Sequence, residues 1–192
     1  MRNLHLVILG RQGSGKGTQC LRVADTYGPI HISTGDMLRI AVTEKTELGL
    51  EAKSIMDSGQ LLPDSIINSI VDQRLEMADV IENGFILDGY PRTTVQAEAL
   101  EKLLLSRNTK LDLVLNLEVP IDEVTKRMLN RSRADDTEEA INRRLEIYET
   151  ETSPLLNWFE ERDLLTVVDG LSSEDEVFLR LEAVISELIS ND

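Results

Sequence analysis

The chain has 192 residues and a formal net charge of −15, from 35 acidic and 20 basic side chains. This length suits one globular domain with a sizeable core, and the acidic balance argues against a nonspecific nucleic-acid binder, which needs a basic surface. The single cysteine, Cys20, cannot close an internal disulfide, and no apolar run reaches the ~20 residues of a membrane span.

Short apolar runs at intervals along the chain are typical of strands buried on both faces of a parallel sheet. Each is bounded by polar residues or glycine and is followed by a helical pattern. These runs are residues 4–9, 85–87, 111–117 and 164–168, with a weaker fifth run at 30–32. The repeated strand–helix order predicts an α/β fold: a doubly wound, five-stranded parallel sheet flanked by helices.

Two stretches exceed what simple crossover helices need. Residues 33–76 hold two or three predicted helices with a break at 59–63, so part of this stretch is expected to project as a flap. Residues 130–136 form a polar turn rich in Arg and Asp, between helices predicted at 121–129 and 138–148. The last helix carries an apolar stripe of 3.6-residue period and begins with a capping box of Ser173 and Glu176.

The segment LVILGRQGSGKGT, residues 6–18, predicts a strand, a glycine-rich turn and the start of a helix. Glycines let successive backbone N–H groups face one anion, and the helix adds its free N-terminal donors. Lys16 would reach the β- and γ-phosphates of a nucleotide, and Thr18 offers a hydroxyl towards Mg²⁺. Gly17 occupies the Ser/Thr position of the strict motif, so this loop is a variant of it.

Three motifs in order make the chain similar to adenylate kinases, a family of nucleoside monophosphate kinases. They are GRQGSGKGTQ at 10–19, HISTGDMLR at 31–39 and GFILDGYPRT at 84–93, and further arginines match up to Arg144. Gln12 departs from the proline that the family often has. Only Ser132 separates Arg131 from Arg133, so the chain resembles the short-lid form, without the insertion that carries zinc-binding cysteines in some relatives.

The resemblance implies the Mg²⁺-dependent reaction ATP + AMP = 2 ADP in one P-loop kinase domain, residues 1–192. It implies an NMP-binding flap at 33–62, a short lid at 130–136 and no structural zinc. The acceptor phosphate is already ionised at neutral pH, so the reaction needs positioning and positive charge rather than a general base. The implied catalytic residues are Lys16, Asp88, Arg92, Arg127, Arg131, Arg133 and Arg144.

The resemblance also assigns two nucleotide sites. ATP would contact Gly13, Ser14, Gly15, Lys16, Gly17, Thr18, Arg127, Arg131, Gly170 and Ser172. AMP would contact Thr34, Arg39, Gln60, Leu61, Leu62, Gly89, Tyr90, Pro91, Arg92, Gln96, Arg133 and Arg144. Asp88 would organise Mg²⁺ through bound water.

Several residues have a structural interpretation beside the functional one. Gln96 would read the adenine edge, but together with Thr93 it also fits a helix cap. Asp88 also fits a simple Asp-Gly turn. Asp135 and Asp136 are expected to anchor lid arginines or cap the next helix rather than bind metal. His5, His31 and Cys20 are expected to be core residues.

Three other functions stay open at this stage. A UMP/CMP kinase would differ in the base-binding residues, a nucleotide-sensing module would have lost its charged residues, and a P-loop ATPase would pass phosphate to water. We expect a monomer that binds neither nucleic acid nor membrane. The N-terminus lacks a signal-peptide cleavage pattern, so we also expect a cytoplasmic location.

Overall fold

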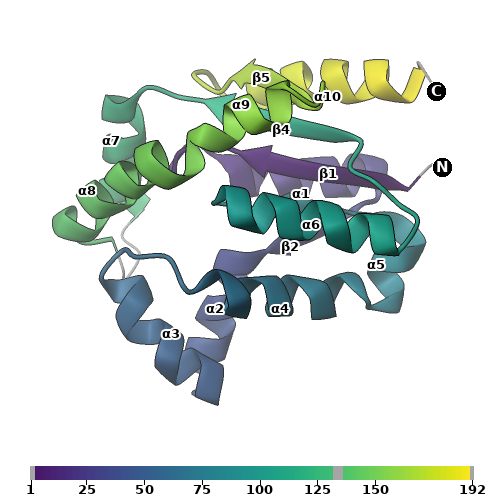
Figure 1. The fold of residues 1–192 in the computed structure, drawn as a ribbon. Coiled ribbons are helices and arrows are strands. Elements are labelled where there is room, and N and C mark those ends of the chain that lie inside the picture. The colour runs from purple at the N-terminus through teal and green to yellow at the C-terminus, as the bar shows by residue number, and fades with distance from the viewer. Residues whose placement is uncertain (1–2, 132–135, 191–192) are drawn as a thin grey trace.

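The computed structural model describes residues 3–131 and 136–190, and its centre is one parallel sheet (Figure 1). The strands are β1 (Leu4–Leu9), β2 (Ile30–Ser33), β3 (Gly84–Asp88), β4 (Leu113–Glu118) and β5 (Leu165–Asp169). Their spatial order is β2-β3-β1-β4-β5, and all neighbours are parallel. The predicted fold class is confirmed. The strand predicted at 111–117 is observed at Leu113–Glu118.

Helices fill the connections between the strands. They are α1 (Lys16–Tyr27), α2 (Thr34–Thr43), α3 (Glu47–Asp57), α4 (Asp64–Leu75), α5 (Ala78–Asn83), α6 (Thr94–Ser106), α7 (Ile121–Arg131), α8 (Glu138–Ile147), the π-helix η1 (Tyr148–Thr152), α9 (Pro154–Glu160) and α10 (Glu174–Ser190). Helices α2 to α4 and the break at 59–63 match the prediction. The predicted helix 121–129 was too short, since α7 continues to Arg131, and the predicted helix 138–148 ends at Ile147 and continues as η1.

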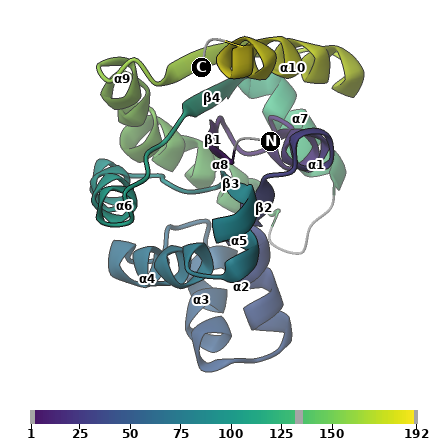
Figure 2. The ribbon, with the colours of Figure 1, turned by 90° about the vertical axis from the view of Figure 1, so that its right-hand side faces the viewer.

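The two faces of the sheet carry separate cores because side chains alternate along each strand. Leu4, Leu6 and Ile8 of β1 pack with α1 and α10. Val7 and Leu9 face the other way and pack with α4, α6 and α9. Figure 2 shows α1 and α6 on opposite sides of the sheet. Continuous burial on both faces explains why the strands read as unbroken apolar runs.

Side-chain caps set the starts of several helices that border the site. The Ser33 hydroxyl accepts from the N–H of Asp36 at the start of α2, and Thr137 caps α8 in the same way. At α10, Ser173 accepts from the N–H of Glu176, whose carboxylate accepts from the Ser173 N–H in return. This confirms the predicted capping box. Hydrogen bonds from Ser172 and Ser173 lower the pKa of Glu176 to about 2.

The carboxyl ends of β1, β3 and β4 meet at one edge of the sheet. From β1 the chain passes to β2 on one side of the sheet, whereas from β3 it passes to β4 on the other side of β1. Ligands of open α/β sheets bind at such a switch point. Helices α2 and α3 project away from the sheet at this end (Figure 1). None of the helices in the described ranges is both long and apolar enough to cross a membrane.

Candidate active site

A cavity of about 520 Å³ opens at the carboxyl edge of the sheet. That volume lies within the range of small-molecule sites. Its walls come from the loop after β1, from α2, the α3–α4 loop, the loop after β3, α7 and α8. The predicted site residues that line it are Gly13, Gly15, Lys16, Gly17, Thr18, Thr34, Arg39, Gln60, Leu61, Leu62, Asp88, Gly89, Pro91, Arg92, Gln96, Arg127, Arg131 and Arg144.

The glycine-rich loop is held by close backbone packing. Gly10 has φ +138°, and a Cβ there would lie 2.5 Å from the carbonyl oxygen of Leu117. At Gly13, with φ +87°, a Cβ would lie 2.7 Å from the carbonyl oxygen of Val124 on α7. Only glycine combines this conformation with this space. The loop is therefore pressed against the end of β4 and against α7 while its inner side lines the cavity.

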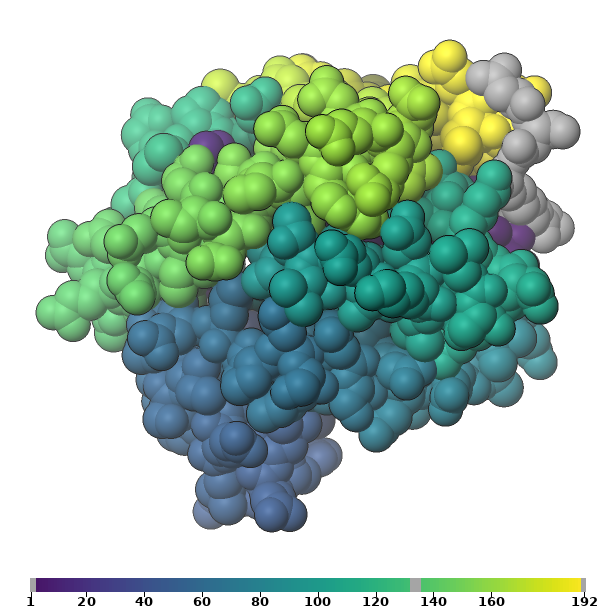
Figure 3. Space-filling model, viewed as in Figure 1, coloured from purple at the N-terminus to yellow at the C-terminus, as the bar shows by residue number. Residues whose placement is uncertain are grey.

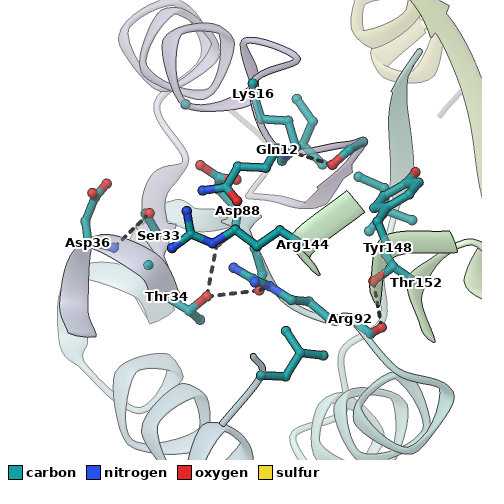
Figure 4. A pocket seen from close by; sticks show the side chains of 18 of the residues that line it. Gln12, Lys16, Ser33, Thr34, Asp36, Asp88, Arg92, Arg144, Tyr148 and Thr152 are labelled. Atoms are coloured by element: carbon teal, nitrogen blue, oxygen red, sulfur yellow. Dashed lines mark hydrogen bonds between the residues drawn. The ribbon is translucent and has the colours of Figure 1, made fainter. Parts of the chain in front are cut away.

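Lys16, the first residue of α1, points into this loop (Figure 4). Its Nζ donates to the carbonyl oxygens of Gly10 at 2.7 Å and Arg11 at 2.9 Å. Burial lowers the pKa of Lys16 to about 8, against the opposing effect of Asp88 and with help from the positive charge of Arg92. A poorly compensated cation at this place favours an anionic ligand.

Asp88 ends β3 and is the carboxylate at the bottom of the cavity. Burial favours its neutral form, but His31, Lys16 and Arg92 outweigh that effect and hold its pKa below the usual value. The carboxylate is therefore ionised at neutral pH. The next residue, Gly89, has φ +80° and accepts a hydrogen bond from the Thr34 hydroxyl at 3.0 Å. The backbone bend at Gly89, which fits the Asp-Gly turn predicted as the alternative, is thus present together with a mostly buried carboxylate that lines the cavity.

Arg92 lies opposite Lys16, after the cis Tyr90–Pro91 peptide bond. Its Nε donates to the Gly89 carbonyl oxygen at 2.7 Å, which directs the rest of the guanidinium into the cavity (Figure 4). Burial lowers the pKa of Arg92, and Arg144 and Arg39 lower it further, against the effect of Asp88. Several guanidinium groups therefore repel one another around one space. A bound phosphate would relieve this repulsion.

Asp136 holds two arginines of the cavity in place. Its carboxylate, with a side chain only 1% exposed, accepts from Arg131 at 2.6 and 3.0 Å and from Arg144 at 2.9 Å. This confirms the expectation that Asp136 anchors arginines: Arg131, within the predicted lid, and Arg144 on α8. Arg144 also donates to the Met56 carbonyl oxygen at 3.1 Å. Helix α8 thus touches the end of α3, and Figure 3 shows the green surface of α8 meeting the blue surface below it.

Arg39 and Arg127 line the cavity from its rim. Arg39 pairs with Asp36 one turn earlier on α2. Arg127 donates to Glu123 at 2.7 Å and to the Ser14 carbonyl oxygen at 3.4 Å, which ties α7 to the glycine-rich loop. Both side chains are partly exposed, so these pairs contribute little to stability.

Gln96 combines the two interpretations given by its sequence position. Thr93 caps α6 by accepting from the Gln96 N–H at 3.2 Å. The buried Gln96 side chain accepts from the Arg92 N–H and donates to Asp64, both at 2.7 Å. The amide therefore fixes the backbone of Arg92, and one N–H and one lone pair remain for a base. Its contact with adenine stays a prediction.

Some predicted site residues lie away from the cavity wall. Tyr90 is buried beneath it and donates to Asn68 at 2.8 Å and to the Gln96 carbonyl oxygen at 3.0 Å. Ser14 is buried within the loop. Gly170 packs against Val119, and Ser172 donates to Glu176. Arg133 and Asp135 fall outside the described residues. The nucleotide contacts predicted for Tyr90, Ser14, Gly170, Ser172 and Arg133 stay predictions, as does the anchoring or capping role expected of Asp135.

The structure adds site residues for which the sequence carries no local signal. Tyr148 and Thr152 of the π-helix η1 line the cavity. The Thr152 hydroxyl donates to the Arg92 carbonyl oxygen at 2.9 Å, so η1 supports the arginine from 60 residues away. Asp64 fixes Gln96, and the Met56 carbonyl receives Arg144. Only the three-dimensional contacts reveal these supporting roles.

The cavity also has the donors that Mg²⁺ prefers. The ionised carboxylate of Asp88 and the hydroxyl of Thr18 both line it, on the side of the glycine-rich loop. Mg²⁺ binds oxygen ligands and keeps several water molecules, so two protein groups and bound phosphates would complete its shell. The residues present therefore fit a magnesium ion that arrives with a nucleotide.

Comparison with known proteins agrees with this geometry. The family model described as adenylate kinase matches residues 8–164. A protein named adenylate kinase from Mycobacterium sp. (strain MCS) is 49% identical over 177 residues, covering 92% of this chain and 96% of that protein. Adenylate kinase 1 from Nostoc sp. is 46% identical, with 94% and 97% covered, and the adenylate kinase of Thermodesulfovibrio yellowstonii is 40% identical, with 96% and 100% covered. The chain belongs to the adenylate kinase family.

Proposed function

We propose that the protein transfers the γ-phosphoryl group of ATP to AMP, reversibly and with Mg²⁺, to give two ADP. The observation that carries this proposal is the convergence of Lys16, Arg92, Arg131 and Arg144 on one cavity, with the ionised carboxylate of Asp88 at its bottom. A concentration of cations in a chain of net charge −15 needs an anionic ligand to explain it. The family membership supports the same reaction.

The residues divide between the two nucleotides by position. Lys16 and the glycine-rich loop would hold the ATP phosphates, with Arg127 and Arg131 on the α7 side. Thr34, Arg39 and Arg92 lie on the opposite wall, where AMP would sit. Arg144 lies between, because Asp136 fixes it beside Arg131 while its charge is felt at Arg92. It would therefore face the transferred group.

Catalysis by this arrangement consists of positioning and charge stabilisation. The AMP phosphate is ionised and needs no base, so the cavity has only to align two phosphates and balance the charge that spreads over the equatorial oxygens. When bound, Mg²⁺ would neutralise part of the phosphate charge beside Asp88 and Thr18. The guanidinium groups of Arg144 and Arg92 would also neutralise phosphate charge. They need not reorganise, because Asp136 already holds Arg144 and the Gly89 carbonyl already holds Arg92.

We also propose that residues 33–62 form an NMP-binding flap and residues 130–136 a short lid. Helices α2 and α3 stand out from the sheet, and their contact with α8 near the cavity runs through Arg144 and Met56. Closure by such segments would keep water from the transferred phosphoryl group. The monomeric state stays a prediction. The cytoplasmic location and the absence of nucleic-acid and membrane partners stay predictions.

A panel of acceptors tests the function. Phosphoryl transfer from Mg·ATP is measured to AMP, UMP, CMP and GMP at equal concentration. We expect kcat/KM for AMP to exceed that for each of the others by at least about tenfold, because a site that hydrogen-bonds one base leaves polar groups unpaired with another. Comparable rates with UMP and CMP would indicate the alternative kinase, and transfer to none would indicate a sensing module.

The lowered pKa of Lys16 predicts a pH dependence. The free enzyme loses this positive charge as the pH rises through about 8, whereas an ordinary lysine keeps it to about 10.5. A nucleotide needs the charged form, so kcat/KM for Mg·ATP at saturating AMP should fall by about tenfold per pH unit above that point. A profile that stays flat up to about pH 10 would contradict the assignment.

The shared anchor Asp136 predicts a loss of both activity and stability. Asp136→Asn removes the negative charge that holds Arg131 and Arg144. Two partly buried cations then lose the carboxylate with which both are paired. We expect unfolding to become easier by about 2–4 kcal/mol and kcat to fall roughly ten- to hundredfold. Chemical denaturation and steady-state kinetics measure the two effects.

A matched control exists on the surface. Asp79 accepts two hydrogen bonds from Arg74, which lies five residues earlier in the chain. Asp136 accepts two from Arg131 at the same spacing. The Asp79 side chain, however, is 48% exposed and does not line the cavity. Asp79→Asn should leave kcat unchanged and cost less stability. Equal effects of the two substitutions would show that Asp136 has no special role in the site.

A further inference from the structure

Three potential metal ligands, one of them the Asp88 carboxylate, meet next to the cavity. One ligand atom each from Cys20, His31 and Asp88 lies within 4.8 Å of the other two. The residues come from α1, β2 and the end of β3, so the parallel sheet and the helix that follows the glycine-rich loop bring them together. In sequence they are too far apart to match the spacing of a local zinc motif.

The surroundings of these groups leave them available to a ligand. Cys20 is fully buried, and its thiol forms no disulfide bond. His31 Nε2 is buried without a hydrogen-bond partner and lies 3.6 Å from an oxygen of Asp88, just beyond hydrogen-bond range. A buried polar atom without a partner costs stability unless something else satisfies it. The unsatisfied nitrogen belongs to one of the three side chains whose ligand atoms lie within 4.8 Å of one another.

We propose that Cys20, His31 and Asp88 form a binding site for Zn²⁺ or another thiol-binding divalent cation. One sulfur, one imidazole nitrogen and one carboxylate oxygen are a normal zinc donor set, with water in the fourth position. Bonds of about 2.0–2.3 Å place tetrahedral ligands roughly 3.3–3.8 Å apart. The His31–Asp88 separation already lies in that range, and the sulfur has at most about 1.5 Å to move.

Binding releases the thiol proton of Cys20. Burial, with the negative charge of Asp88, raises the pKa of Cys20, so the thiol is protonated in the free protein. The cation replaces that proton on sulfur, and the proton passes to solvent.

Occupation of this site would inhibit the enzyme, and this part of the inference rests on the proposed function. The same Asp88 carboxylate faces the cavity, where it would organise the magnesium of Mg·ATP. A cation bound to Cys20 and His31 draws the carboxylate away from that position and adds positive charge beside Lys16. We therefore expect the thiol-binding cation to reduce kcat even when Mg·ATP is saturating.

Cobalt titration tests binding independently of activity. The nucleotide-free protein is titrated with CoCl₂, and the near-ultraviolet charge-transfer band of a cobalt–thiolate bond is recorded. The chain has one cysteine, so such a band reports Cys20 alone. We expect a saturable band that ZnCl₂ displaces, that is absent in Cys20→Ala, and that needs roughly tenfold more cobalt in His31→Gln.

The controls keep the outcome decisive. Far-ultraviolet circular dichroism checks that both variants are folded, and removal of one sulfur from the core is a small change. A folded wild-type protein without the band, or an unchanged cobalt requirement in His31→Gln, would overturn the site.

Turnover is then measured at fixed free Zn²⁺ set by a metal buffer. Inhibition of the wild type that is lost in Cys20→Ala supports the coupling to Asp88. Binding without inhibition would overturn that coupling while leaving the metal site standing.

Discussion

Lys16→Met is expected to leave a folded protein whose kcat falls roughly 10²–10³-fold. Methionine keeps most of the side-chain volume but removes the charge that would contact the transferred phosphate. The free energy of unfolding without nucleotide should not fall below that of the wild type, because burial disfavours the charged lysine and lowers its pKa to about 8. Steady-state kinetics and chemical denaturation at neutral pH measure the two quantities.

The separation of activity from stability makes this prediction specific. A lysine that served only the packing of the loop would lose stability and activity together. Lys102, which is 78% exposed on α6, is the matched control, and Lys102→Met should change neither quantity. Near-normal turnover in Lys16→Met would contradict the placement of ATP on the glycine-rich loop.

Arg92→Ala is expected to raise the KM for AMP and to lower kcat by roughly 10²–10⁴-fold. Arg92 Nε is fixed on the Gly89 carbonyl, so the other two guanidinium nitrogens face the cavity as a preformed fork. Arg92→Lys should recover little, since a lysine cannot bind a phosphate with two parallel hydrogen bonds. The KM for Mg·ATP should change much less than the KM for AMP.

The control for this substitution lies next to Arg144. Arg143 is 47% exposed and pairs with Glu146 on the outer side of α8. Arg143→Ala should leave both KM values and kcat unchanged. If Arg92→Ala instead raised the KM for Mg·ATP and spared that for AMP, the two nucleotide sites would have been assigned to the wrong walls of the cavity.

The strands could be predicted from the sequence because the sheet is buried on both faces. Under that condition an unbroken apolar run is the expected pattern, as in Leu4–Leu9, whose predicted bounds match those of β1. The weak signal at 30–32 has a physical reason, since β2 is an edge strand in which only Ile32 is fully buried. The glycine-rich loop is equally local, because its backbone conformation depends on glycines at set positions.

The support of the site could not be predicted in the same way. The contact between Thr152 and Arg92 depends on the π-helix η1, which has no sequence signature, and on chain segments 60 residues apart. Asp136 could be expected near the lid arginines, but its simultaneous pairing with Arg131 and Arg144 follows from the packing of α7 on α8. His31 was expected in the core, and only the pairing of β2 with β3 places it beside Asp88.

The fate of a labelled γ-phosphoryl group tests the central claim most directly. ATP labelled at its γ-phosphate is incubated with Mg²⁺ and the enzyme, with or without unlabelled AMP. With AMP, the label should pass into ADP in proportion to the AMP consumed, and without AMP the ATP should remain intact. Release of labelled inorganic phosphate at the same rate in both samples would show that water, rather than a second nucleotide, receives the group.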